Sequence, residues 1–170
     1  MADDDTFTLA ANADAVREAA EALFAMVAAE LISVLPGSAE VLHVGATAVP
    51  GCLTKGDLDI VVRVDRADFA VSEALLAKRF GRNEGSIRTD EFAAFEDPNR
   101  RPNLGVQLTV KGGALDDFHR FAEELRRDPH LVRRYNDLKL RFNGKPMDDY
   151  RAAKDAFVTE ILSGRDAGTP

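Results

Sequence analysis

A chain of 170 residues has the length of one domain and can bury a single hydrophobic core. Its 22 basic and 29 acidic side chains give a net charge of −7, which argues against a protein that grips nucleic-acid phosphates and favours a small substrate. No apolar run approaches the roughly 20 residues that cross a bilayer, and a lone cysteine, Cys52, excludes an internal disulfide or a cysteine-based zinc site.

The two ends of the chain carry little pattern. Residues 1–10 begin with an acidic stretch and show no apolar period, so we predict a flexible N-terminal segment there. A secretory signal starts with basic residues and turns apolar, which this stretch does not, so we expect a cytoplasmic protein without membrane attachment. Residues 165–170 are predicted to be a tail, and residues 11–164 a single domain.

The first third of the chain reads as a helix, a short strand and a loop. From about Asn12, apolar residues recur at helical spacing until the Pro36-Gly37 pair, which predicts an amphipathic helix. A strand is predicted over residues 41–44. The glycine-rich stretch over residues 45–56 is predicted to be a loop that can open with one helical turn.

The strongest strand pattern follows this loop. Residues 57–64 are β-branched and nearly all apolar after the first three, which predicts an interior strand covered on both faces. Residues 65–80 are predicted to form a helix that Asp65 caps and Gly81 terminates.

The second half changes from strands to helices. Strands over residues 86–95 and 104–110 flank a turn at residues 97–99, so we expect a hairpin-like pair. After two consecutive glycines the pattern is helical, with helices predicted over residues 116–126, 131–142 and 148–162. The predicted fold class is α/β: a mixed sheet with helices, followed by a helical C-terminal third packed on it.

Two carboxylates open the predicted interior strand. Asp57 and Asp59 lie two residues apart, so their side chains share one face with Cβ atoms roughly 6–7 Å apart. At that separation two charges repel by about 3 kcal/mol at an effective dielectric near 20. A divalent cation, a basic side chain or open water offsets such repulsion, and magnesium suits the geometry. The alternative is that Asp57 lies in solvent before the strand begins and only Asp59 faces inward.

A glycine turn precedes this pair by twelve residues. The strand ending in Gly45 continues as Ala46 and Thr47, whose backbone N–H groups can cradle an anion, and Thr47 adds a hydroxyl donor. The alternative is that Gly45 only permits a tight exit from the strand. Lys55, two residues before Asp57, can meet a phosphate or neutralise the acidic pair.

The turn and the acidic pair together resemble the signature of the nucleotidyltransferase superfamily, in which Gly and a small residue are followed about a dozen residues later by Gly/Ser-Asp-hydrophobic-Asp-hydrophobic. Gly45-Ala46 and Gly56 to Ile60 match this pattern. More narrowly, His43 to Gly51 resembles the His-hydrophobic-Gly-Ser-Thr-Ser-hydrophobic-Pro-Gly stretch of the GrpB family. The family's later Pro, Tyr-x-x-Leu-Lys and Tyr-x-x-x-Lys positions are matched by Pro129, Tyr135-Asn136-Asp137-Leu138-Lys139 and Tyr150-Arg151-Ala152-Ala153-Lys154.

The resemblance covers about residues 40–162 and implies a nucleotidyltransferase fold. It implies that Asp57 and Asp59 hold magnesium, and that the Gly45-Ala46-Thr47 turn and Lys55 hold the triphosphate of a nucleotide. Active nucleotidyltransferases carry a third carboxylate on a later strand. The corresponding strand here, residues 105–109, has Gln107 as its polar central residue, and a neutral amide can coordinate or hydrogen-bond a phosphate without replacing the missing charge.

The helical third carries two tyrosine–lysine pairs at helical spacing. Tyr135 and Lys139, and likewise Tyr150 and Lys154, lie four residues apart and share one helix face. If these faces turn toward the acidic end of the sheet, the lysines bind phosphate and the tyrosines bound the base pocket. The alternative is that each tyrosine belongs to the core and each lysine covers it with its alkyl stem.

Three functions follow from these residues. The first is an enzyme that binds a nucleoside triphosphate with magnesium and transfers a nucleotidyl group to an unknown acceptor. The second is a non-catalytic module that binds a nucleotide or another phosphate-bearing small molecule, which the replacement of the third carboxylate by Gln107 favours. The third is a structural or partner-binding relic of the fold. His43 is expected to be a buried, hydrogen-bonded histidine, and Cys52 an ordinary small residue.

Overall fold

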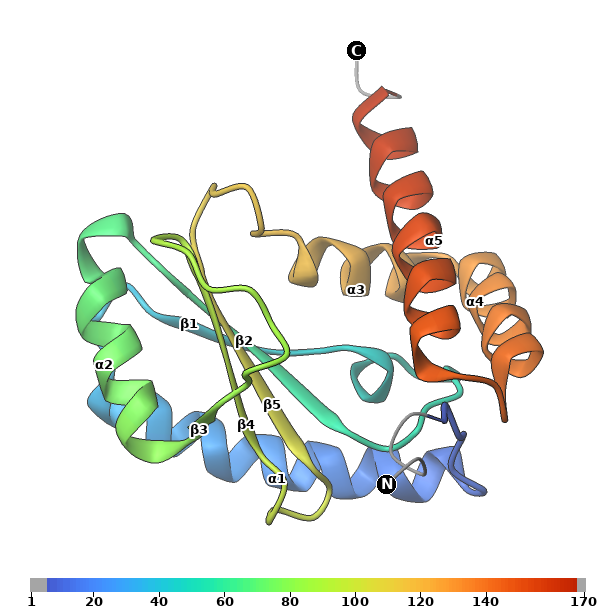
Figure 1. The fold of residues 1–170 in the computed structure, drawn as a ribbon, viewed down its shortest axis with the longest axis horizontal. Coiled ribbons are helices and arrows are strands. Elements are labelled where there is room, and N and C mark those ends of the chain that lie inside the picture. The colour runs from blue at the N-terminus through green and yellow to red at the C-terminus, as the bar shows by residue number, and fades with distance from the viewer. Residues whose placement is uncertain (1–5, 168–170) are drawn as a thin grey trace.

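The computed structural model describes residues 6–167, with side chains described through residue 164 (Figure 1). Apart from a short strand at residues 81–82 that the sequence does not predict, strands and helices follow one another along the chain in the predicted order. They are α1 (Ala13–Val34), β1 (Glu40–Val44), η2 (Ala46–Ala48), β2 (Leu58–Val64), η3 (Arg66–Asp68), α2 (Phe69–Arg79), β3 (Gly81–Arg82), β4 (Phe92–Asp97), β5 (Leu104–Val110), α3 (Phe118–Arg127), α4 (Pro129–Phe142) and α5 (Met147–Ala167).

The strands form one mixed sheet in the order β1-β2-β5-β4-β3. The interior strand β2 pairs antiparallel with β1 and parallel with the central strand β5, and β5 pairs antiparallel with β4. The register places Asp59 of β2 between Val44 of β1 and Gly105 of β5. The α/β fold class is confirmed, as is the pairing of the strands that flank residues 97–99.

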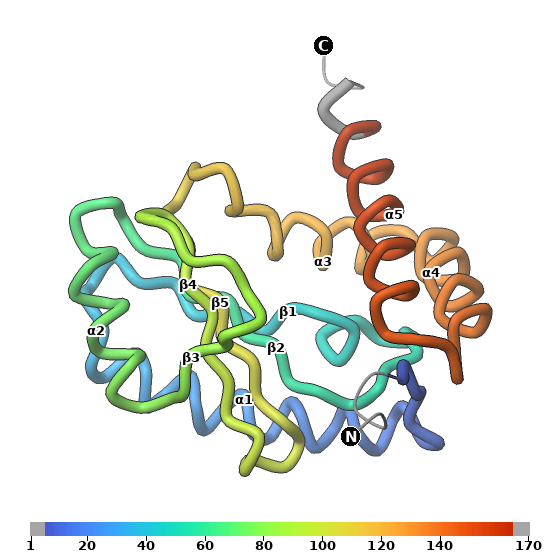
Figure 2. The backbone as a smooth tube through the Cα atoms, viewed as in Figure 1, coloured from blue at the N-terminus to red at the C-terminus, as the bar shows by residue number. Residues whose placement is uncertain are grey.

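One face of the sheet carries the main hydrophobic core. Alternate residues of β2 and β5 point to this face and pack against α1 and α2, which lie together on one side of the sheet while α3, α4 and α5 gather on the other (Figures 1 and 2). Burying each such aliphatic side chain contributes about 1.5–3 kcal/mol. The fully buried members from β2 and β5 are Leu58, Ile60, Val62, Val64, Val106 and Leu108. Because β2 alternates, Asp59 and Arg63 point to the opposite face.

A second hydrophobic cluster joins the three C-terminal helices to the loop that follows β1. Val49 and Cys52 of this loop pack against residues of α3, α4 and α5, among them Leu125, Tyr135 and Phe157. Helix α3 also contacts β1. The helical third is therefore held against the end of the sheet at which Gly45 and Asp59 lie.

Residues 6–10 are attached to the helical third. The Phe7 ring is buried and stacks on Tyr150 with ring centroids 3.7 Å apart. The Phe7 N–H donates to the Lys145 carbonyl at 2.9 Å, and the Ala10 N–H donates to the Thr54 carbonyl at 2.9 Å. The prediction of a flexible segment over residues 1–10 is therefore wrong for residues 6–10. The buried ring of Phe7 anchors them, and a single aromatic residue leaves no periodic pattern in the sequence. Residues 1–5 lie outside the described part.

Other element boundaries differ in detail from the prediction. Strand β4 begins at Phe92, six residues after the predicted start, because residues 83–91 form turns that precede the pairing with β5. Helix α5 continues through Ala167, so residues 165–167 of the predicted tail are helical, and residues 168–170 lie outside the described part. Within the described residues, no helix is both long enough and apolar enough to cross a membrane.

Candidate functional site

A cavity of about 370 Å³ lies where the sheet meets the three C-terminal helices. Its volume is in the range of small-molecule sites. The sheet side and the β1 turn contribute polar groups, and the helices contribute mostly apolar ones. The lining residues are Val44, Gly45, Ala46, Asp59, Gln107, Leu115, Asp117, Phe118, Phe121, Ala122, Leu125, Tyr135, Lys154, Asp155 and Val158.

The carboxylate of Asp59 is wedged between two glycines. A Cβ atom at Gly45 would lie 2.6 Å from one carboxylate oxygen, and a Cβ atom at Gly105 would lie 3.1 Å from the other. Gly45 also has φ +76°, a conformation that side chains rarely adopt. The carboxylate between them therefore explains why both positions are glycine. Gly45 does more than permit a tight exit from the strand, because it also makes room for Asp59.

Asp59 is costly to ionise in its present surroundings. Burial raises the pKa of its carboxyl to about 6, against the opposing effect of the Lys154 ammonium, and the charge of Asp57 adds to the rise. Within residues 6–164, the Asp59 carboxylate forms no hydrogen bond or ion pair. A half-buried carboxylate without a partner facing a cavity is a group that a bound cation would stabilise.

Asp57 and Lys55 pair with each other. The Lys55 ammonium lies 2.9 Å from the Asp57 carboxylate, whose side chain is 29% exposed. Asp57 precedes the first residue of β2, and neither residue is among those that line the cavity. Two roles were predicted for Lys55, and the ion pair with Asp57 corresponds to the one in which the lysine neutralises an acidic side chain.

The Thr47 hydroxyl links the turn to the start of β2. Thr47 is buried and donates to the Asp57 carbonyl at 3.0 Å, while His43 Nε2 lies 2.9 Å from the same hydroxyl oxygen. Since a hydroxyl has one proton, His43 Nε2 donates to Thr47. The predicted hydroxyl contact from Thr47 to a phosphate is not set up here, and the cavity is lined instead by Gly45 and Ala46.

His43 forms the hydrogen bond that the sequence analysis expects, but its side chain is half-buried and not fully buried. Burial lowers its pKa to about 4, and the Arg126 guanidinium acts in the same direction. Its ring stacks on Phe24 of α1 with centroids 5.2 Å apart. The histidine therefore supports the turn from the core side of the sheet.

Helix α4 holds the loop that leads to Asp57. Asn136 donates from Nδ2 to the Gly51 carbonyl at 2.9 Å and accepts from the Leu53 N–H at 2.8 Å. The Lys139 ammonium donates to the Leu53 carbonyl at 2.6 Å. Lys139 is only 2% exposed, and burial lowers its pKa to about 7. The charge of Lys139 acts on Asp59 at the acidic end of the sheet, while its ammonium already donates to the backbone of the loop, so phosphate binding by this lysine stays a prediction.

The tyrosine–lysine pair of α5 is arranged in the opposite way. Lys154 lines the cavity, whereas Tyr150 does not and stacks on Phe7. Tyr135 of α4 lines the cavity, and its hydroxyl lies 3.3 Å from the Tyr150 hydroxyl. Each predicted pair therefore contributes one residue to the cavity.

The apolar wall of the cavity comes from α3, which the sequence did not mark as functional. Phe118, Phe121, Ala122 and Leu125 recur at helical spacing. That pattern is the same as the pattern of a core-facing helix. Only the cavity between α3 and the sheet distinguishes the two, so sequence periodicity could not have identified this wall.

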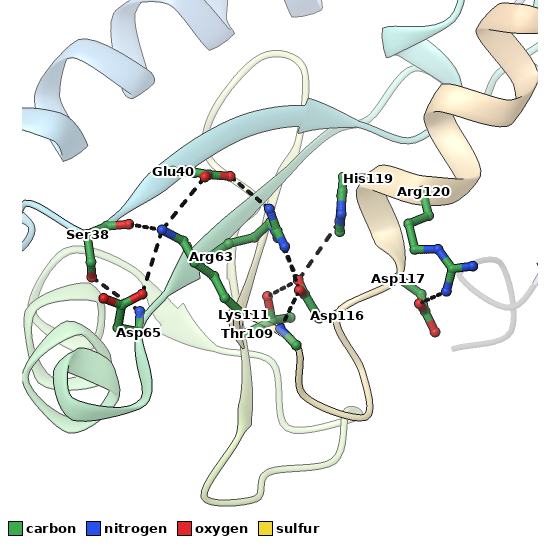
Figure 3. A network of polar contacts seen from close by, with 11 residues as sticks. Ser38, Glu40, Arg63, Asp65, Thr109, Lys111, Asp116, Asp117, His119 and Arg120 are labelled. Atoms are coloured by element: carbon green, nitrogen blue, oxygen red, sulfur yellow. Dashed lines mark hydrogen bonds and ion pairs between the residues drawn. The ribbon is translucent and has the colours of Figure 1, made fainter.

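A buried ion pair anchors the start of this wall. Arg63 of β2 donates to both oxygens of Asp116 at 2.7 Å, and Asp116 also accepts from the Thr109 hydroxyl at 3.1 Å and the Gly112 N–H at 2.9 Å (Figure 3). Burial acts to raise the pKa of Asp116, but these donors, Arg63 foremost, hold it below its usual value. The network fixes the connection between β5 and α3, where Leu115 and Asp117 line the cavity.

Gln107 lies on the same sheet face as Asp59, two residues beyond Gly105. Its Oε1 atom is buried and has no hydrogen-bond partner within the described residues. Across those residues, no group of three or more histidine, cysteine, aspartate or glutamate side chains is placed to hold a metal ion. Magnesium, however, commonly uses one or two carboxylates and completes its octahedral shell with water and phosphate oxygens. Asp59 on the cavity, together with Asp57 just before β2, whose charge acts on Asp59 and which now pairs with Lys55, fits that donor set.

Comparison with known proteins places this geometry in a family. A family model described as GrpB protein matches residues 14–164. The chain belongs to the GrpB family. This GrpB-family chain is 31% identical over 152 residues to a UPF0157 protein of Vibrio cholerae, covering 89% of this chain and 80% of that protein. It is 30% identical over 141 residues to a UPF0157 protein of Streptomyces coelicolor, covering 78% of this chain and 72% of that protein.

Solved structures support the fold. The crystal structure of GrpB from Enterococcus faecalis superposes with a TM-score of 0.68 at 21% identity, covering 86% of this chain and 92% of that chain. The Cid1 poly(U) polymerase superposes with a TM-score of 0.52 at 13% identity, covering 73% of this chain and 40% of that chain. Identities this low show the fold alone, and that fold is nucleotidyltransferase-like, as the sequence predicts.

Proposed function

We propose that this GrpB-family chain binds a nucleoside triphosphate together with magnesium in the cavity between the sheet and α3. The observation that carries the proposal is the Asp59 carboxylate, which faces the cavity without a partner and which two glycines accommodate. A magnesium ion would give this carboxylate the positively charged partner that it lacks, and the ion would also bind phosphate oxygens of the nucleotide.

Each side of the cavity has a distinct part in the proposal. Asp59 and Asp57 hold the metal, and the backbone of Gly45 and Ala46 faces the phosphates. Lys154 lines the same cavity from α5, its charge acts on Asp59, and it binds phosphate. Tyr135 and the apolar wall of α3 bound the base or the acceptor. Lys55, now paired with Asp57, becomes available for phosphate once the metal takes over that carboxylate.

A nucleotide bound at this site is either turned over or held without reaction. In the first case, the chain transfers a nucleotidyl group: an acceptor hydroxyl forms a bond to the α-phosphorus, its proton passes to water, and the bond to pyrophosphate breaks. Lys154 would neutralise charge on the phosphates, and a cation held by Asp57 and Asp59 would supply further positive charge there. In the second, the chain binds the nucleotide without turnover, and the neutral Gln107 on the cavity floor favours this outcome. Pyrophosphate release from a labelled triphosphate, measured with extracts that supply acceptors, separates the two. A cytoplasmic location, where nucleotides and magnesium are abundant, is part of the proposal.

The binding proposal predicts a magnesium-dependent thermal shift. A ligand at about 100 times its Kd adds about 2.7 kcal/mol to the free energy of unfolding, which raises the Tm of a chain this size by about 5–10 °C. We expect this shift with at least one of the four nucleoside triphosphates when magnesium is present, and we expect Asp59→Asn to abolish it. Differential scanning calorimetry measures both.

The matched control is Asp90→Asn, which removes the same charge from an exposed loop position away from the cavity. This variant should keep the full shift. The absence of a shift with every triphosphate would overturn the proposal, and a shift retained by Asp59→Asn would show that the ligand binds elsewhere.

A further inference from the structure

We infer that the site takes a single divalent cation and that the Lys154 ammonium provides the second positive charge beside Asp59. The inference rests on the proposed function and deepens it. Two-metal sites in phosphoryl and nucleotidyl transfer need carboxylates that bridge and flank both ions. The cavity floor of this chain offers too few of them, and a lysine stands on the opposite wall.

The strands beside Asp59 contribute no further carboxylate. Its register partners are Val44 in β1 and Gly105 in β5, and the next residue of β5 on the same face is the neutral Gln107. Gly105 is also the position at which a Cβ atom would meet the Asp59 carboxylate at 3.1 Å. On the same face, Glu96 of β4 lies opposite Gly105, but its side chain is exposed and does not line the cavity. Among the described strands it is therefore Asp59 that brings a carboxylate to the cavity, with Asp57 just ahead of β2.

The helical walls do not make up the difference. Asp117 and Asp155 line the cavity, but Asp117 accepts from Arg120 at 2.9 Å. Within the described residues, neither aspartate forms with Asp59 a group of three metal donors. A second divalent ion would have to bind to phosphate oxygens with one carboxylate at most, next to an ion of the same charge.

Lys154 is placed to act where that second ion is missing. It lines the cavity together with Asp59, and its charge is the largest that opposes the burial-driven rise in the Asp59 pKa. Its helix is held by the stacking of Phe7 on Tyr150 and of Phe157 on Tyr135, whose centroids lie 5.4 Å apart. An ammonium on a fixed helix can bind phosphate as a point charge.

The test counts bound cations. Electron paramagnetic resonance measures free Mn²⁺ during a titration of the full chain with a non-hydrolysable triphosphate analogue present. We expect one Mn²⁺ per chain in the wild type and two in Gln107→Glu, which adds a carboxylate of nearly the same shape on the cavity floor. Two ions in the wild type, or one ion in a folded Gln107→Glu, would overturn the inference while leaving the proposed function intact. Failure to bind any Mn²⁺ would overturn both.

The role of Lys154 is tested by how its substitution changes two affinities, that for Mn²⁺ alone and that for the triphosphate analogue with Mn²⁺. In Lys154→Met, we expect the Mn²⁺ affinity of the nucleotide-free protein to be unchanged or higher, because a neighbouring positive charge is removed. We expect the affinity for the triphosphate analogue with Mn²⁺ to fall about tenfold or more. Lys78→Met, an exposed position on α2, is the matched control and should change neither. A parallel loss of both affinities in Lys154→Met would overturn the role, because it would indicate a disturbed α5.

Discussion

Asp59→Asn is expected to make the metal-free protein more stable at neutral pH while removing its ability to bind the metal and the nucleotide. Burial raises the pKa of Asp59 from 3.8 to about 6, so at pH 7 the folded protein holds an ionised carboxylate in surroundings that disfavour it. The full shift corresponds to about 3 kcal/mol, and because the side chain keeps some contact with solvent, we expect a gain of about 2 kcal/mol.

The pH dependence of this gain follows from the direction of the shift. Below pH 3.8 the carboxyl is protonated in both the folded and unfolded states, so the charge costs nothing. Between pH 3.8 and about 6 the unfolded chain releases the proton first, so the stability contributed by the protonated form is lost as the pH rises. The gain from Asp59→Asn should therefore be less than half as large at pH 4.5 as at pH 7.5.

Urea denaturation of both proteins at pH 4.5 and 7.5, without divalent cations, measures this effect. Asp90→Asn, at an exposed loop position, controls for the loss of one negative charge from an acidic protein. If Asp59→Asn were less stable than the wild type at pH 7.5, the carboxylate would be part of the structure itself, and the argument for a functional, unpartnered group would fail.

Asp116→Ala is expected to give the largest loss of stability among the polar substitutions considered. The Asp116 side chain is 5% exposed and the Arg63 side chain 17%, so removal of the carboxylate leaves a largely buried guanidinium whose one remaining ion-pair partner among the described residues is Glu40. Breaking such a pair costs about 3–5 kcal/mol. The Thr109 hydroxyl and the Gly112 N–H lose their acceptor as well.

Calorimetry should record this loss as a decrease in Tm of about 10 °C. Asp117→Ala is the matched control, because the neighbouring carboxylate is partly exposed and its pair with Arg120 at the surface is worth at most about 1 kcal/mol. Equal losses in the two variants would contradict the role that we give to the Asp116 network. Because the network fixes the connection to α3, Asp116→Ala should also weaken nucleotide binding, whereas Asp59→Asn acts on the ligand directly.

The features that the sequence predicted well are those with local causes. The β-branched run of residues 57–64 and the apolar pattern of residues 104–110 predict the adjacent strands β2 and β5. Residues 97–99 predict the turn between β4 and β5. Asp59 could be assigned to one face of its strand by alternation alone. The sequence also predicts that Gly45 belongs to the same site as Asp59, because the glycine turn and the acidic pair occur together in one motif.

The features that it could not predict depend on contacts between distant segments. Tyr135 with Lys139 and Tyr150 with Lys154 have identical spacing, yet Lys139 is taken up by the Leu53 carbonyl and Lys154 lines the cavity. The difference arises from how α4 and α5 meet the loop after β1, which spacing within a helix does not encode. The same applies to Thr47, whose hydroxyl is used by the backbone ahead of β2.

The central claim, that a nucleotide and its cation bind at the Asp59 end of the cavity, is tested most directly by anomalous diffraction. Crystals grown with Mn²⁺ and a non-hydrolysable triphosphate analogue should show one anomalous peak between the carboxylates of Asp57 and Asp59, with phosphate density extending toward Gly45 and Lys154. A bound triphosphate with no manganese beside Asp59, or with its phosphates outside this cavity, would contradict the account.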